Sequence, residues 1–274
     1  MPRRTAASPL GERMAALAAE DAAVLAASLV QAPRDPRGVH EARKAVRRLR
    51  SLLALGHDAR GKEVRPLDRA LRALAKGLSA LRDAQVVVET AALMADESDD
   101  TDEVEAWQRI RDALAQRHAS LLHDTLQKDP GFARRQAQAH RHAEQLQQLP
   151  WHQVHGGCLR HALEKSAQRQ QRAQQVALAS GRVDDLHDWR RRSRRLRMQF
   201  HAMRKLEVRL DAHAMRHLPA PGKEISALVD QLGALQDLAL LQKALRSLER
   251  QHASSDVAPR RRRTASRERI LPLA

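Results

Sequence analysis

Residues 40–50 read His40-Glu-Ala-Arg43-Lys44-Ala-Val-Arg47-Arg48-Leu-Arg50, and residues 187–197 read His187-Asp-Trp-Arg190-Arg191-Arg192-Ser-Arg194-Arg195-Leu-Arg197. Each stretch begins with a histidine and carries basic residues 3, 4, 7, 8 and 10 positions later, and the histidines are 147 residues apart. Spacings of three, four and seven place side chains on one face of a helix. The sequence therefore predicts two helices, each with one cationic face.

The face opposite the cations is apolar in both stretches. At 100° per residue, the basic side chains of the first stretch fall within an arc of about 160°. The other side of that helix carries Val39, Ala42, Ala45, Val46, Leu49 and Leu53, and the second helix carries Trp189, Leu196 and Phe200 there. Arg192 projects away from the basic face, so it is not included among the candidate binding residues.

The charge pattern of these faces favours a polyanionic ligand. A run of charge is usually a solvated helix face, but such faces normally mix both signs. Here almost no acid accompanies the cations, so neighbouring side chains repel each other. The whole chain carries a formal net charge of +16, with 41 Arg and 8 Lys. Arginine binds phosphate oxygens through two parallel hydrogen bonds, whereas lysine acts as a point charge.

Aromatic side chains are scarce, with three Trp, two Phe and no Tyr. Proteins that bind single-stranded nucleic acid stack bases on aromatic rings. Trp189 and Phe200 lie on the side predicted to be buried, so the cationic faces offer phosphate recognition with little means of reading bases. Nucleic acid remains a possible partner that the composition does not favour, and no helix-turn-helix pattern is visible.

The composition predicts an all-α protein, because Ala, Leu, Arg, Gln and Glu dominate and all favour helices. We expect a first antiparallel helical bundle over residues 8–149, a second over 156–252, and a disordered basic tail over 253–274. A boundary falls at Pro150 and Gly156-Gly157. Within these bundles we expect a helical stretch over 62–95 with kinks at Pro66 and Gly77, a basic helix over 184–210 and a last helix over 223–252.

A second repeated element supports an internal duplication. Leu78-Ser-Ala-Leu81-Arg82-Asp83 resembles Leu232-Gly-Ala-Leu235-Gln236-Asp237, and each follows its own basic helix. Two pseudo-symmetric bundles would bring the basic helices together around a central cationic groove or pore. Gln236 stands where the first copy has Arg82, so the second copy offers one cation fewer.

The sequence carries no motif typical of an enzyme or a metal site. His152, His155 and Cys158 lack a nearby fourth ligand for zinc, and no phosphate-binding loop, nucleophile motif or carboxylate cluster is visible. We therefore predict no catalytic residue, metal or cofactor. Cys158 is the only cysteine, which is compatible with a reducing cytoplasm. The N-terminal region lacks signal-peptide character, and no apolar run approaches the ~20 residues that span a bilayer, so no membrane is expected.

The histidine-headed helices and the Leu-x-Asp elements resemble the CHAD domain family, named for a conserved histidine and an α-helical fold. The resemblance covers roughly residues 8–252 and implies one CHAD-like domain over 1–252 built of two repeats. It also implies binding of inorganic polyphosphate by helices that line a central pore, and association with polyphosphate granules. A general polyanion-binding or nucleic-acid-binding helical protein is the alternative, and a scaffold for an acidic protein partner is a third possibility.

The candidate polyphosphate-binding residues come from the two basic helices and the first Leu-x-Asp element. They are His40, Arg43, Lys44, Arg47, Arg48, Arg50, Arg82, His187, Arg190, Arg191, Arg194, Arg195 and Arg197. Arg48, Arg50, Arg195 and Arg197 flank the faces, so they either bind the ligand or pair with carboxylates of neighbouring helices. Asp83 and Asp237 are the predicted carboxylates for that structural role.

Overall fold

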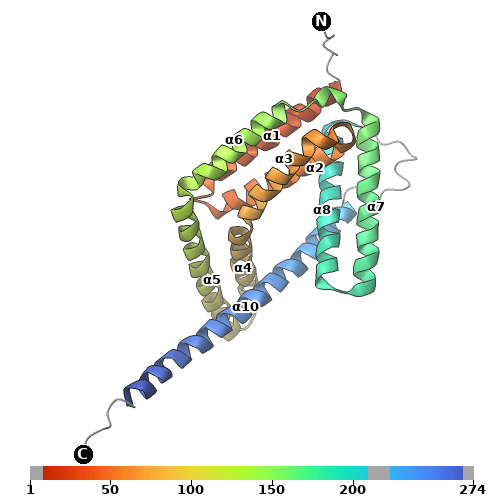
Figure 1. Cartoon of the computed structure of the whole chain (residues 1–274). Coiled ribbons are helices and arrows are strands. Elements are labelled where there is room, and N and C mark those ends of the chain that lie inside the picture. Colours follow the sequence, from red (N-terminus) through yellow and green to blue (C-terminus); the bar gives the residue numbers. More distant parts are fainter. Residues whose placement is uncertain (1–8, 209–222, 268–274) are drawn as a thin grey trace, which may run out of the picture.

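The computed structural model describes residues 9–208 and 223–267, and every regular element within these ranges is helical (Figure 1). This confirms the predicted all-α class. In chain order the elements are α1 (Pro9–Gln31), α2 (Pro36–Leu55), α3 (His57–Gly77), α4 (Ser79–Glu97), α5 (Thr101–Lys128), η1 (Pro130–Phe132), α6 (Ala133–Gln147), η2 (Trp151–Gln153), α7 (Gly156–Ser180), α8 (Val183–Lys205) and α10 (Lys223–Arg267).

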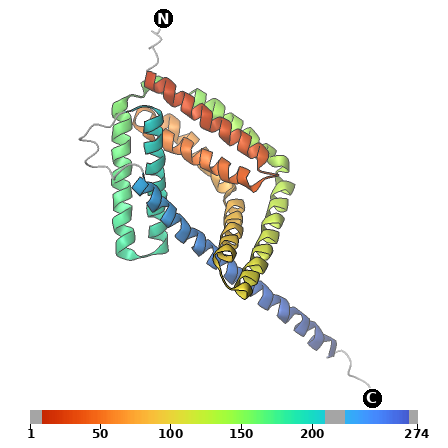
Figure 2. The ribbon, with the colours of Figure 1, turned by 180° about the vertical axis from the view of Figure 1, so that it is seen from behind.

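The helices are arranged as a four-sided frame of ribbons (Figures 1 and 2). Helices α1 and α6 lie side by side along one side, together with α2 and α3. The α4–α5 hairpin and the α7–α8 hairpin form two further sides. Helix α10 contacts both α8 and α4 and forms the fourth side. The frame therefore places α2, α4, α8 and α10 around one common region.

The largest core cluster draws side chains from both halves of the chain. Met14 of α1, Leu49 of α2 and Leu71 of α3 are completely buried in it, as are Leu163 of α7 and Leu196 of α8. Burying a leucine side chain of this kind contributes about 1.5–3 kcal/mol. The two halves therefore share one core and do not have separate cores.

Helix α10 packs against the first half as well as the second, which differs from the bundle predicted over 156–252. Leu241 is buried against Val87 and Ala91 of α4 and Leu114 of α5, and Arg117 of α5 donates a hydrogen bond to the Ser247 carbonyl. Leu232, nearer the start of α10, packs in another cluster with α7 and α8. Apolar residues along α10 thus join both hairpins, a pairing that local periodicity does not specify.

The basic helix α2 is amphipathic as predicted. The six apolar residues expected opposite its cations are all at most 3% exposed. Asp35 caps the helix by accepting a hydrogen bond from the Arg37 backbone N–H at 2.8 Å, and Pro36 occupies the first turn. A Cβ on Gly38 would lie 2.5 Å from the Ala32 nitrogen. Glycine at this position therefore allows α2 to start in close contact with the end of α1.

The second basic helix ends earlier than predicted. Helix α8 stops at Lys205, whereas its pattern predicted continuation to about Leu210. Glu207 adopts a left-handed φ of 53°, Val208 N–H bonds to the Met203 carbonyl and Glu207 N–H bonds to the Arg204 carbonyl. These paired bonds are those of a Schellman ending, which satisfies the last carbonyls of the helix. Residues 209–222 lie outside the described part.

Two other predicted elements differ in detail. The stretch expected over 62–95 is divided at Leu78 into α3 and α4, next to the kink predicted at Gly77, whereas Pro66 lies inside α3 without ending it. The final helix was expected to end near residue 252, with a disordered tail beyond it. Helix α10 instead extends to Arg267, through a segment rich in Arg and Ala, which favour helices.

Helix α1 is long and apolar enough to cross a membrane by length and composition, with a mean hydropathy of 1.4 over its most apolar window. This differs from the expectation that no apolar run is long enough, which rests on Glu20 and Asp21 interrupting the stretch. In the structure α1 packs against α2 and α6, and Leu25 and Leu29 are buried in the main core. Core helices commonly pass such a test.

Candidate functional site

The two basic helices contact each other through their basic faces. Ser51 of α2 donates a hydrogen bond from Oγ to Met198 Sδ of α8 at 3.7 Å. The Gln199 side-chain amide donates to the Ser51 carbonyl at 3.5 Å. Because Ser51 and Met198 lie one turn beyond Arg47 and Arg194 in their respective helices, this contact directs both cationic faces toward a common space.

Arg47 and Arg194 are the most strongly perturbed cations of the site. Burial lowers the pKa of Arg47 to about 10, and the positive charges of Arg43, Arg190 and Arg82 act in the same direction. Burial also lowers the pKa of Arg194 to about 9, assisted by Arg47 and Arg190. Within the described residues, neither guanidinium forms an ion pair, and the buried Arg47 Nε has no hydrogen-bond partner. Both remain protonated at neutral pH, so the site holds uncompensated positive charge.

Arg43 and Arg190 occupy equivalent positions and are each held by a neighbouring element. Arg43 Nη1 donates to the Ala75 carbonyl and to Ser79 Oγ, both at 2.6 Å. Arg190 Nη1 donates to Gln236 Oε1 of α10. Burial lowers the pKa of both arginines, and the carboxylates of Asp83 and Asp237, respectively, oppose that shift. Gln236 therefore orients Arg190. It carries no charge, unlike Arg82, which stands at the corresponding place in the first Leu-x-Asp element.

Three of the four flanking arginines form ion pairs, but not with the predicted carboxylates. Arg48 Nε lies 2.5 Å from Asp21 Oδ1, and Arg197 Nη1 lies 3.0 Å from Asp230 Oδ1. Arg50 donates two hydrogen bonds to Asp68, at 2.8 and 3.1 Å. Asp83 of α4 and Asp237 of α10 act on Arg43 and Arg190 instead, because α4 packs against α2 and α10 packs against α8. These pairs reduce the flanking positive charge in apo protein.

Arg195 is the flanking arginine without such a pair. No ion pair or hydrogen bond of its side chain occurs among the described residues. Burial lowers the pKa of Arg195, and the nearby Arg50 and Arg169 lower it further while Asp68 opposes them. Arg195 therefore carries unneutralised charge close to Arg47 and Arg194.

The remaining predicted residues lie at the edges of the two faces. Burial lowers the pKa of His40, whose Nε2 is 3.8 Å from Glu41 Oε1. Lys44 Nζ lies 3.3 Å from the same carboxylate. His187 is exposed. Arg82 pairs with Glu89 at 2.9 Å, and Arg191 pairs with Asp188.

A cavity of about 350 Å³, here called the central cavity, lies where α2 and α8 meet α3 and α7. No carboxylate lines it. The lining residues other than Ser51, Ser166 and Met198 are all arginines, namely Arg47, Arg50, Arg72, Arg169, Arg191, Arg192, Arg194 and Arg195. This cavity brings together predicted residues from both basic helices.

Three of these arginines were not predicted. Arg192 was excluded on the helical projection, yet it lines the central cavity while pairing with Asp188 at 3.0 Å. Its long side chain reaches around the helix, which a projection of Cα positions does not represent. Arg72 of α3 and Arg169 of α7 had a usable signal. Arg65, Arg69 and Arg72 follow the helical spacing of one face, as do Lys165 and Arg169.

Other cavities surround this site. The α3–α7 cavity, about 640 Å³, shares Ser166, Arg169 and Arg195 with the central cavity. The α1–α8 cavity lies on the side of α2 and α8 that faces α1 and α10, and contains Lys44, Arg48 and Arg197 of the predicted set. Together the three cavities place cations on both sides of the α2–α8 contact.

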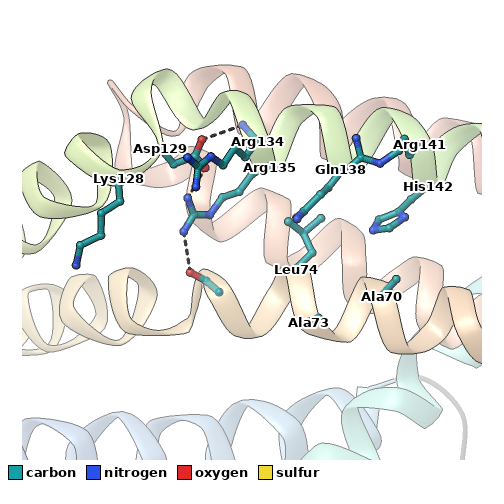
Figure 3. A pocket seen from close by; sticks show the side chains of 11 residues that line it. Ala70, Ala73, Leu74, Lys128, Asp129, Arg134, Arg135, Gln138, Arg141 and His142 are labelled. Atoms are coloured by element: carbon teal, nitrogen blue, oxygen red, sulfur yellow. Dashed lines mark hydrogen bonds and ion pairs between the residues drawn. The ribbon is translucent and has the colours of Figure 1, made fainter.

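A separate cavity between α3 and α6 contains none of the predicted residues (Figure 3). Lys128, Arg141 and His142 line it, as does Arg135. Arg135 is already engaged, since its Nη1 lies 2.5 Å from Asp129 Oδ2 and its Nη2 donates to the Gly77 carbonyl. Arg135 in this cavity is therefore already bound by other groups of the protein (Figure 3).

The described ranges contain no group of three or more His, Cys, Asp or Glu residues placed to hold a metal ion. Cys158 Sγ contacts His155 Nε2 at 3.0 Å, and no further ligand joins them there. No aromatic residue lines the central cavity. Trp189 and Phe132 are buried in the cores.

The comparisons with known proteins agree with this architecture. The family model of the CHAD domain matches residues 10–246. The chain is similar to the crystal structure of the CHAD domain from the plant Ricinus communis, with a TM-score of 0.60 and 21% sequence identity. That match covers 92% of this chain and 83% of the plant chain. No curated protein matches.

Proposed function

This chain belongs to the CHAD domain family, and we propose that it is a non-catalytic binding protein for inorganic polyphosphate. The polymer lies against the basic faces of α2 and α8, which form a cationic groove between two halves that arose by internal duplication. The proposed location is the cytoplasm, at polyphosphate granules. The proposal rests on the family membership for the ligand and on the charges of the site for the mechanism.

The observation that carries the proposal is the pair Arg47 and Arg194. Buried cations normally have a carboxylate partner, since unpaired charge is costly to remove from water. These two have none within the described residues, and other arginines surround them. A phosphate chain would supply the missing negative charge and several acceptor oxygens. Mutual repulsion and loss of hydration raise the free energy of these cations without a ligand. Binding of an anion relieves both effects and is therefore favoured.

The composition of the central cavity favours a phosphate polymer without bases. Its wall provides guanidinium groups and two serines but no ring on which a base could stack. The cations are fixed on helices, so a narrow flexible chain can follow them more closely than a rigid duplex can. A general polyanion-binding protein, including one that binds nucleic acid, is the outcome to be tested against this.

A competition titration tests the proposal. Labelled long-chain polyphosphate is bound at about physiological ionic strength and challenged with duplex DNA, RNA and short phosphates at matched phosphate concentration. We expect nucleic acids to displace the label poorly. Equal displacement by DNA or RNA would make the protein a general polyanion binder.

Salt dependence and a matched pair of variants locate the interaction. Affinity should fall steeply with salt, as it does for phosphate contacts of nucleic-acid-binding proteins, and loss of one contact should lower the slope by about 1. Arg194→Met removes a central cation, whereas Arg204→Met removes an exposed arginine from the same helix. Only the first should weaken binding and reduce the slope. If both variants bind like the wild type, the proposed site is wrong.

A further inference from the structure

The two halves differ in how they neutralise one flanking arginine. In the first half, Asp21 of α1 pairs with Arg48, which lies 27 residues later. Arg195, which corresponds to Arg48 in the sequence pattern, has no ion pair among the described residues, and the charge of Arg169 of α7 acts on it. At this arginine the second half therefore has a nearby cation where the first half has a paired carboxylate.

The two sides of the α2–α8 contact also differ in how many of their cations are paired. In the α1–α8 cavity each lysine and arginine has a carboxylate partner. Arg48 pairs with Asp21, and Arg197 with Asp230. The other two pairs are Lys44 with Glu41 and Lys205 with Glu20. That side is close to neutral, so an anion approaching it would have to compete with existing ion pairs.

The side toward α3 and α7 contains cations that have no carboxylate partner among the described residues, notably Arg47, Arg194 and Arg195. The central cavity and the α3–α7 cavity adjoin through Ser166, Arg169 and Arg195. Asp68 is the only carboxylate that lines either of them, and Arg50 already occupies both of its oxygens. Within the described residues, Arg195 and Arg169 have no ion pair. Positive charge thus continues from the central cavity into the space between the two helices.

The continuation has a regular geometry along α3. Arg65 and Arg69 line the α3–α7 cavity, and Arg72 lines the central cavity. These residues lie four and three positions apart on one face of α3, and the span from the first to the last is about 10 Å at 1.5 Å per residue. Across the cavity, Lys165 and Arg169 are spaced by one turn of α7. Two rows of cations therefore face the same elongated space.

We propose that polyphosphate enters and leaves the site on one side only, along a track that runs from Arg194 through Arg195 and Arg169 to Arg69 and Arg65. This inference rests on the proposed function. It explains why cations are paired on the α1–α8 side of the α2–α8 contact and partly unpaired on the other side. Short chains occupy the central cavity alone, and longer chains also lie between α3 and α7. The track accordingly determines how affinity depends on chain length.

Charge reversal at Arg169 tests the track. Arg169 is exposed, so Arg169→Glu should fold, and Arg172→Glu is the matched control because Arg172 is exposed on the same helix and lines neither cavity. Affinities are measured for a short and a long polyphosphate at one ionic strength. We expect Arg169→Glu to weaken long-chain binding by about tenfold and short-chain binding much less. Arg172→Glu should change either by less than about twofold.

A second variant separates loss of binding from loss of folding. Arg169→Gln removes the exposed charge without reversing it, so it should keep the melting temperature of the wild type while weakening long-chain binding less than Arg169→Glu does. If Arg169→Glu and Arg172→Glu behave alike for long chains, the track is wrong. If Arg194→Met also has no effect on either chain length, the proposed function itself fails. A loss in Arg194→Met without a specific loss in Arg169→Glu overturns only the track.

Discussion

Ser51 Oγ and Met198 Sδ lie 3.7 Å apart, and the two residues are separated by 147 positions, the interval that separates His40 from His187. Equivalent residues of the two basic helices therefore contact each other. A contact between equivalents is what an approximate two-fold axis between α2 and α8 requires. One turn away, the same relationship brings the cations Arg47 and Arg194 toward one another, and the charge of Arg47 adds to the effect of burial in lowering the pKa of Arg194.

Replacing either central arginine should stabilise the apo protein and weaken binding. Arg47→Met and Arg194→Met keep much of the side-chain volume but remove a buried charge without a partner. Such replacements are neutral or stabilising, and we expect about 1 kcal/mol, or about 2–4 °C in melting temperature for a protein of this size. Polyphosphate affinity should fall about tenfold or more, because charge-assisted hydrogen bonds are lost. Thermal melts and titrations on the same samples measure both, and a lower melting temperature would contradict the assignment of Arg47 as an uncompensated cation.

Polyphosphate binding should strengthen as the pH falls, partly through His40. Burial, then Arg82, lowers the pKa of His40 in the apo protein, with Glu41 acting in the opposite direction. Below pH 6.5 the unfolded chain therefore binds the proton first, and this residue reduces stability as the pH falls toward its folded pKa. A bound phosphate favours the imidazolium and raises that pKa, so affinity increases across the same window.

Titrations of a long chain at pH 5.5, 6.5 and 7.5 and constant ionic strength measure this effect. The test is the difference between wild type and His40→Gln, because every other group is common to the two proteins. The variant should have a shallower pH dependence. Parallel pH profiles for the two proteins would exclude a role for His40 in binding.

Gly233 provides space for a site residue. A Cβ at this position would lie 2.9 Å from Arg190 Nη2. Gly233→Ala should raise or preserve stability, since alanine in a helix interior is favoured over glycine by about 0.5–1 kcal/mol, but it should displace the Arg190 guanidinium and weaken binding. Gly77→Ala is the control, because a Cβ there meets no atom within 4 Å. Equal affinities of the two variants for polyphosphate would contradict the assignment of Arg190 to the site.

Replacing Asp68 should lower the stability of the protein and raise its affinity for long polyphosphate. Asp68→Asn removes the charge that pairs with the partly buried Arg50, and we expect a loss of about 1–2 kcal/mol in the free energy of unfolding. The same change removes the one carboxylate from the α3–α7 cavity, so long polyphosphate should bind more tightly. Asp230→Asn is the matched control. Its side chain is 72% exposed, so its stability effect should stay within about 0.5 kcal/mol. Weaker polyphosphate binding by Asp68→Asn would count against the track.

The helical class and the amphipathic division of α2 could be predicted from sequence because both depend on local periodicity. Val39, Ala42 and Leu49 alternate with the cations at helical spacing, and burial follows directly from that pattern. The ion-pair partners could not be predicted. Asp21 lies on α1 and Asp230 on α10, and nothing local shows which carboxylate a helix will meet after packing. The assignment of Asp83 and Asp237 to the flanking arginines failed for this reason.

The extent of the cationic site was underestimated for a related reason. The predicted residues lie mainly in the two stretches headed by histidine, whereas Arg72 and Arg169 reach the same cavity from other helices. Their helical spacing was visible in the sequence, but a row of arginines on a third helix gains meaning only once that helix is known to lie beside the first two. The early end of α8 depends on the left-handed Glu207, a conformation that the residue type does not indicate.

The position of α10 has a consequence for the order of assembly during synthesis. Val87 and Ala91 of α4 must wait for Leu241, about 150 residues later, before their apolar surface is covered. Contacts so distant in sequence slow folding and leave surface exposed in intermediates. Gln236, which binds Arg190, also lies on α10. This part of the site is therefore completed only after α10 has been synthesised. A nascent chain would therefore complete the proposed binding site in a single late step, and until then it exposes an apolar hairpin beside an incomplete cationic surface.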